Sequence, residues 1–123
     1  MSPAVHSFCR FYRQLGSDGL KDLSGVYDRN AVLENPIHRL NGLTQISDYL
    51  RSALIKVRYC HINIELSTEK DHQAMVKWTM VYTHAKLNGG YGITVSGASH
   101  LEFDNKVYLQ RDYFDMRNML YEH

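Results

Sequence analysis

Two short stretches of the sequence carry side chains suited to proton transfer. In the first, Asn35-Pro36-Ile37-His38, the proline predicts a bend or the end of a strand. His38 follows that bend in a predicted loop, where a histidine can act as an acid, a base or a hydrogen-bond donor near neutral pH. An exposed loop histidine without such a role is equally common. Asn35 could orient a water or a ligand oxygen, or it could only satisfy the backbone of the turn.

Asp112 belongs to the second stretch, a predicted strand over residues 106–114. Because side chains alternate along a strand, one face of it carries Tyr108, Gln110, Asp112 and Phe114. If that face borders a pocket, the carboxyl group is a candidate general acid or base. The alternative is a carboxylate that only bonds a neighbouring hydroxyl or arginine at the rim of the sheet.

Large, soft side chains alternate in the same way along a second predicted strand, over residues 74–87. Trp78, Met80, Tyr82 and His84 share one face of it. Such a face suits the wall of an apolar pocket, and it equally suits ordinary core packing against a helix.

Tyrosine is unusually frequent, at nine of the 14 aromatic residues. Its ring and hydroxyl group suit both half-wet surfaces and ligand pockets. We expect Tyr59, Tyr82 and Tyr108 to border the pocket, and Tyr12 and Tyr49 to pack on the faces of helices.

The elements that must position these residues follow from periodicity and breaker residues. Apolar residues at helical spacing predict a first helix that opens at Pro3 and ends at Gly16. The rest of the N-terminal half divides into a short helix over 20–23, a strand over 26–34, a loop over 37–42 and a third helix capped by Thr44.

The C-terminal half changes to β-branched and aromatic runs. Four strands are predicted, over residues 59–68, 74–87, 91–103 and 106–114. Asn88-Gly89 between two of them is a strong hairpin signal. Three helices followed by this meander predict an α+β fold, with the helices packed on one face of a curved, mainly antiparallel sheet that leaves a cavity at its open end.

Composition limits the possible function classes. The 123 residues, 44% hydrophobic with a formal net charge of +1, predict a single domain over residues 1–123 and no nucleic-acid partner. No apolar run reaches the roughly 20 residues that cross a bilayer, so we expect no membrane partner. The N-terminus lacks the apolar stretch of a secretory signal, which favours the cytoplasm. Cys9 and Cys60 are too few for a disulfide framework, and no metal site or organic cofactor is expected.

The sequence resembles SnoaL-like proteins of the nuclear-transport-factor-2-like superfamily. The residues that carry the resemblance are the segment 33–38 with Gly42 and a helix after it, and the C-terminal segment 110–115. The resemblance covers the whole chain and implies a cone-shaped, cystatin-like α+β fold, a homodimer built on the sheet, and a cone interior that faces Asp112. Burial among aromatic rings would then raise the pKa of Asp112 toward that of a working base.

Three enzyme groups of the superfamily give the resemblance different meanings. Ketosteroid isomerases place their base at the position of Asn35 and their oxyanion-hole acid at that of Ser99, and both positions depart from the pattern here. Limonene-epoxide hydrolases are similar at Asn35 and Asp112, but Trp78 and Met80 stand where they need an arginine and an aspartate. In SnoaL-like cyclases an aspartate and a histidine share the work, which Asp112 with His38 or His100 could supply.

We therefore expect a protein that binds a small apolar or polycyclic metabolite, with Asp112 as acid or base and with Asn35 and His38 assisting it. The reaction would be an isomerisation, cyclisation or hydration. The expected ligand-binding residues are Trp78, Met80, Tyr82, Tyr59, Ser99, Tyr108, Gln110 and Phe114. The alternatives are a non-catalytic ligand carrier and a dimeric protein-interaction module, and the latter would have a filled cone.

Overall fold

The helices lie mainly in the N-terminal half of the computed structural model, which describes residues 1–18 and 23–115. Helix α1 spans Pro3–Asp18, so it opens at the predicted proline but continues past Gly16. A short helix α2 spans Leu23–Val26. The predicted second helix lies largely outside the described residues, and Val26, predicted as the start of a strand, ends α2 instead.

Helix α3 spans Gly42–Leu54 and begins two residues before the predicted cap at Thr44. The N-cap is Asn41, and its backbone N–H donates to Oε1 of Gln45 at 2.8 Å. Gly42 has a φ of +88°, which a residue with a side chain rarely adopts. The chain therefore turns into the helix directly from the preceding strand.

Within the described residues, six strands form one mixed sheet. They are β1 (Tyr27–Glu34), β2 (Arg39–Asn41), β3 (Val57–Lys70), β4 (Gln73–His84), β5 (Ile93–Phe103) and β6 (Val107–Phe114). Their order in the sheet is β2-β1-β6-β5-β4-β3, and only the β1–β6 pair is parallel. The predicted four-strand meander is confirmed, whereas β2 lies in the segment predicted to be a loop.

The predicted hairpin at Asn88-Gly89 is also confirmed. β4 and β5 are antiparallel neighbours, and the turn between them contains a single 3-10 helical turn, η1 (Asn88–Gly90), in which all three residues have positive φ. β4 ends at His84, three residues before the predicted end of this strand.

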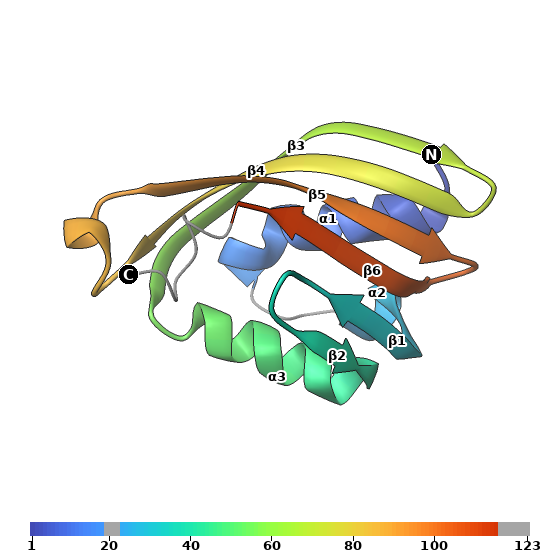
Figure 1. Ribbon diagram of the computed structural model, residues 1–123, viewed down its shortest axis with the longest axis horizontal. Coiled ribbons are helices and arrows are strands. Elements are labelled where there is room, and N and C mark those ends of the chain that lie inside the picture. Colours follow the sequence, from blue (N-terminus) through green and yellow to red (C-terminus); the bar gives the residue numbers. More distant parts are fainter. Residues whose placement is uncertain (19–22, 116–123) are drawn as a thin grey trace.

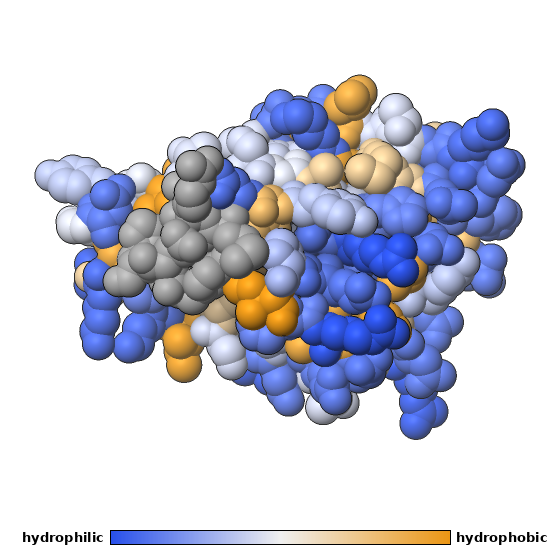
Figure 2. All heavy atoms as spheres, in the orientation of Figure 1, coloured by the Kyte–Doolittle hydropathy of each residue, from blue (hydrophilic) through white to orange (hydrophobic). Residues whose placement is uncertain are grey.

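Helices and sheet form two layers with the core between them. Figure 1 shows the long strands β3 and β4 bending over α1, while α3 lies beside β1 and β2. Phe8 of α1, Ile46 of α3 and Leu101 of β5 are almost completely buried between the layers. The α+β class predicted from the sequence is confirmed. The face seen in Figure 2 is mostly hydrophilic, with a smaller group of hydrophobic side chains near its centre.

No helix in the described part of the chain is both long and apolar enough to cross a membrane.

Candidate functional site

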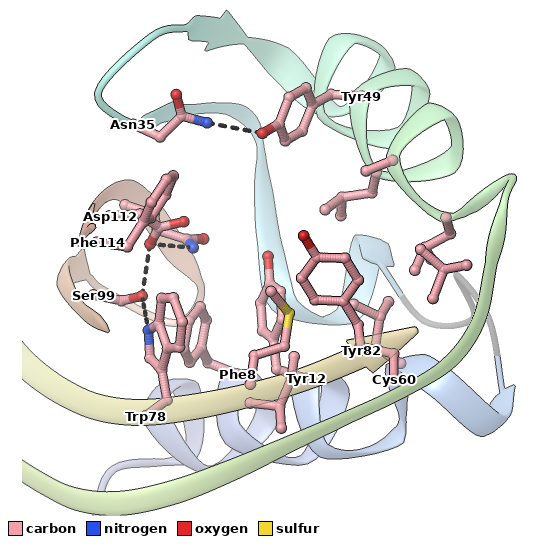
Figure 3. Close-up of a pocket in the computed structure, with 18 of the residues that line it drawn as sticks. Phe8, Tyr12, Asn35, Tyr49, Cys60, Trp78, Tyr82, Ser99, Asp112 and Phe114 are labelled. Carbon is pink, nitrogen blue, oxygen red and sulfur yellow. Dashed lines mark hydrogen bonds between the residues drawn. The ribbon is translucent and has the colours of Figure 1, made fainter. Parts of the chain in front are cut away.

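A cavity of about 150 Å³ lies between the helices and the inner face of the sheet (Figure 3). Its wall is built from α1, α3, the turn after β1 and strands β3 to β6, and it is mostly apolar. A cavity of roughly this volume, engineered in another protein, holds a benzene molecule. The space here therefore suits a compact organic group about the size of one ring.

Asp112 is the charged group in this wall. It lies opposite Ser99 in the β5–β6 register, and its Oδ1 accepts hydrogen bonds from Ser99 Oγ at 2.6 Å and from Gln110 Nε2 at 2.8 Å. Burial raises the pKa of Asp112 from its ordinary 3.8 to about 6, although these two hydrogen bonds act in the opposite direction. A carboxyl group with this pKa can both accept and release a proton near neutral pH.

The direction of each hydrogen bond around Asp112 can be assigned. Trp78 Nε1 is a donor only, and it donates to Ser99 Oγ at 3.0 Å, so the single Ser99 proton goes to Asp112. On the other side, Tyr27 donates its proton to Gln110 Oε1, and Gln110 donates to Asp112 through Nε2. Oδ1 is thus an acceptor of two bonds. In the neutral form of Asp112, the proton therefore belongs on Oδ2.

Tyr12 completes this network from α1. Its hydroxyl lies 2.6 Å from that of Tyr27, and because the Tyr27 proton is already donated to Gln110, Tyr12 is the donor. Burial raises the pKa of both tyrosines, that of Tyr27 strongly. Both hydroxyls therefore stay protonated and hold Gln110 in place.

Asn35 stabilises the turn, which is one of its two predicted roles, and its side chain also reaches the cavity wall. Its Oδ1 accepts the backbone N–H groups of Ile37 and His38 at 2.9 and 2.8 Å, which stabilises the turn. Its Nδ2 donates to the Tyr49 hydroxyl at 3.0 Å, and both side chains line the cavity. His38 does not line the cavity. It is exposed, and its ring centre lies 5.3 Å from that of Tyr49.

Most of the predicted wall residues meet at the cavity. Besides Asp112 and Asn35, these are Trp78, Met80, Tyr82, Ser99, Gln110 and Phe114. Trp78 lies against Phe114, with ring centres 6.4 Å apart, and Figure 3 shows Trp78, Ser99 and Asp112 joined in one chain of hydrogen bonds.

Two predicted wall residues, Tyr59 and Tyr108, lie outside the cavity, with 53% and 41% of their surfaces exposed. Tyr59 pairs with Thr83, whereas its neighbour Cys60 pairs with Tyr82 and faces inward. Tyr108 sits at a bulge, because Glu102 pairs with Leu109 but Phe103 pairs with Val107. The extra residue breaks the alternation that predicted its direction.

Sequence reasoning missed three tyrosines of the site. Tyr12 and Tyr49, expected only to pack on helix faces, line the cavity. Tyr27 donates a hydrogen bond to Gln110 of the cavity wall. A usable signal existed, because a tyrosine on an apolar face needs a partner for its hydroxyl when it is buried. Which partner it finds depends on contacts that are distant in the sequence.

The described residues of the site do not form a metal-binding cluster. Within residues 1–18 and 23–115, no group of three or more histidine, cysteine, aspartate or glutamate side chains could hold a metal ion. The thiol of Cys60 lines the cavity, and burial raises its pKa, which makes it less reactive as a nucleophile.

A family profile for the SnoaL-like domain matches residues 8–108. The chain belongs to the SnoaL-like family. This confirms the resemblance to SnoaL-like proteins that was predicted from residues 33–38 and 110–115.

Several solved structures share the fold. A protein from Shewanella putrefaciens CN-32 assigned as a SnoaL-like polyketide cyclase is 16% identical, with 96% of this chain and 93% of that chain covered and a TM-score of 0.79. An LEH-like epoxide hydrolase from M. tuberculosis is 19% identical, with 94% and 85% covered and a TM-score of 0.77. A Catenulispora acidiphila DSM 44928 protein with a ketosteroid isomerase-like fold, in complex with trimethylamine, is 13% identical, with 98% and 92% covered and a TM-score of 0.78. A search of curated proteins finds no match.

Proposed function

We propose that this SnoaL-like protein binds a compact organic ligand in its cavity and that Asp112 transfers a proton to or from that ligand. The observation that carries the proposal is the asymmetry of the Asp112 carboxyl group. Oδ1 holds both hydrogen bonds that Asp112 makes within the described residues, while Asp112 is part of the cavity wall. Such a group is held in position by one oxygen and is available to a ligand through the other.

The pKa of Asp112 supports the same role. At a pKa of about 6, roughly nine in ten molecules carry the carboxylate at pH 7, and the remainder carry the acid. A general base with a pKa just below the working pH is both populated and strong enough to remove a proton. Tyr12, Tyr49 and Tyr82 complete a wall that would orient the ligand.

The reaction class is narrowed by what surrounds Asp112. The arginine and aspartate that limonene-epoxide hydrolases need are replaced by Trp78 and Met80, and both of these line the cavity. The Asn35 oxygen, which would help to hold a water, already accepts two backbone N–H groups. Isomerisation or cyclisation is therefore favoured over hydration of an epoxide.

A non-catalytic carrier is the second candidate, and one experiment separates the two. A library of small ketones, lactones, phenols and aminoketones is screened by ligand-observed NMR, and each binder is then incubated in D₂O with the protein. If Asp112 is a base, wild type accelerates deuterium incorporation at an acidic carbon of a bound ligand, and Asp112→Asn loses the acceleration at least a hundredfold.

The control for this experiment is Asp104→Asn, the same substitution at an exposed carboxylate away from the cavity. It should leave exchange unchanged. Binding without any exchange in wild type would favour the carrier. Absence of binding by every fragment would refute the proposed function as a whole.

The homodimer through the outer face of the sheet remains a prediction, as does a cytoplasmic location. The outer face carries exposed apolar side chains at Leu66, Met75 and Tyr113, which favours an interface there. Sedimentation velocity of wild type against Tyr113→Glu measures the oligomeric state directly.

A further inference from the structure

The polarity of the cavity wall points to the kind of ligand that it would bind. Among the described residues, six aromatic side chains line the space: Phe8, Tyr12, Tyr49, Trp78, Tyr82 and Phe114. In Figure 3 these rings, which come from helices α1 and α3 and from strands β4 and β6, surround the open volume. The face of an aromatic ring is electronegative and attracts a cation within about 6 Å of its centre.

The charge of the cavity wall is negative, which also favours a cation. Asp112 is the one charged side chain among the described residues that line the cavity. The next residue on the strand, Arg111, is exposed and lies 3.8 Å from Glu34, outside the cavity wall. No basic group of the described wall therefore neutralises the carboxylate.

Four hydrogen-bond donors of the wall, in contrast, are engaged by other side chains. The protons of Trp78, Ser99 and Tyr12 each go to another side chain of the network. One N–H of Asn35 goes to a tyrosine hydroxyl in the same way. A ligand that carries a permanent negative charge needs donors directed at it, and these four are already engaged.

We propose that the ligand of this cavity presents a compact positive group, an alkylammonium, to the aromatic rings and to Oδ2 of Asp112. This inference rests on the proposed function, because it takes the cavity to be the ligand site, and it adds the charge class of the ligand. A nitrogen that carries three or four small alkyl groups has about the bulk of the single ring that a cavity of this volume accepts. Its charge is spread over alkyl groups that pack on aromatic faces.

The test compares two probes of the same shape that differ only in charge. Choline and 3,3-dimethylbutan-1-ol are titrated separately into the wild-type protein, and binding is followed by calorimetry and by the fluorescence of Trp78, the only tryptophan. We expect choline to bind at least tenfold more tightly. Asp112→Asn should weaken choline binding at least tenfold and change binding of the neutral alcohol less than threefold.

A second variant keeps the test independent of Asp112. Phe114→Leu removes one ring from the wall and should weaken choline binding more than binding of the alcohol, with Tyr113→Leu on the outer face as its matched control. Equal or tighter binding of the alcohol, or no binding of choline, overturns the cation proposal. If neutral fragments still bind in that case, the proposed function stands, and if nothing binds at all, both proposals fail.

Discussion

Replacing Asp112 by asparagine should stabilise the protein, by an amount that depends on pH. Asparagine has the same shape, and its Oδ1 can accept the same two hydrogen bonds from Ser99 and Gln110. The folded state raises the pKa of this carboxyl group from 3.8 to about 6, so ionising it costs free energy in the folded state. At about 1.4 kcal/mol per pH unit, the cost is about 3 kcal/mol.

The sign of the pH dependence follows from the raised pKa. Well below pH 3.8 the carboxyl group is neutral in both states, and its pKa shift has no effect on stability. Between pH 4 and pH 6 the unfolded chain loses the proton while the folded protein keeps it, so the wild type loses stability as pH rises. Above pH 7 the difference in the free energy of unfolding between Asp112→Asn and wild type is constant at its maximum. For a domain of this size, that maximum corresponds to roughly 10 °C in Tm.

Thermal unfolding of both proteins from pH 4 to pH 8, followed by circular dichroism, measures this difference. Asp71→Asn serves as the control, because Asp71 is exposed in the turn between β3 and β4 and forms no ion pair within the described residues, so its substitution should leave the Tm difference nearly flat across the range. A Tm difference between Asp112→Asn and wild type that does not change with pH would refute the reasoning. So would a variant that is less stable than wild type at pH 8, because the carboxylate would then be stabilising.

Two further substitutions test the surroundings of Asp112. Ser99→Ala removes a hydrogen bond that favours the carboxylate, so the pKa of Asp112 should rise above about 6. NMR titration of the Asp112 carboxyl carbon measures this pKa. An unchanged or lower pKa would contradict the assignment of Ser99 as the donor. Gly97→Ala places a Cβ 2.6 Å from the Trp78 ring and 2.7 Å from the Tyr113 carbonyl oxygen. The substitution should therefore lower the free energy of unfolding, measured in urea, by about 1–3 kcal/mol and change the tryptophan emission. Unchanged stability and emission would show that the Trp78 ring is not confined there.

The sequence predicted the fold well where the signals are local. The apolar period of α1, the long β runs and the Asn88-Gly89 turn each depend on neighbouring residues, and each led to the correct element. β2 was missed because three residues carry too little pattern to be recognised. β2 forms because it pairs with β1, and that pairing depends on a tertiary contact rather than on the local sequence preference of its three residues.

The candidate site was predictable where alternation along a strand is regular. Trp78, Met80 and Tyr82 follow the period of β4 without interruption and line the cavity as a set. Alternation failed at Tyr108 because a bulge adds one residue to β6 there. Bulges depend on how two strands fit together, so a single strand's sequence does not show them.

The two oxygens of Asp112 distinguish a functional carboxyl group from a structural one. A carboxylate that only stabilised the sheet would be expected to pair with a cation or to use both oxygens, because an ion in an apolar wall is costly without partners. Here a chain of donors from Trp78 and Tyr12 converges on Oδ1, and no cation among the described residues of the wall offsets the charge. The network holds Oδ1 and leaves Oδ2 without a hydrogen bond among the described residues, and a bound cation would supply the compensation that the described wall lacks.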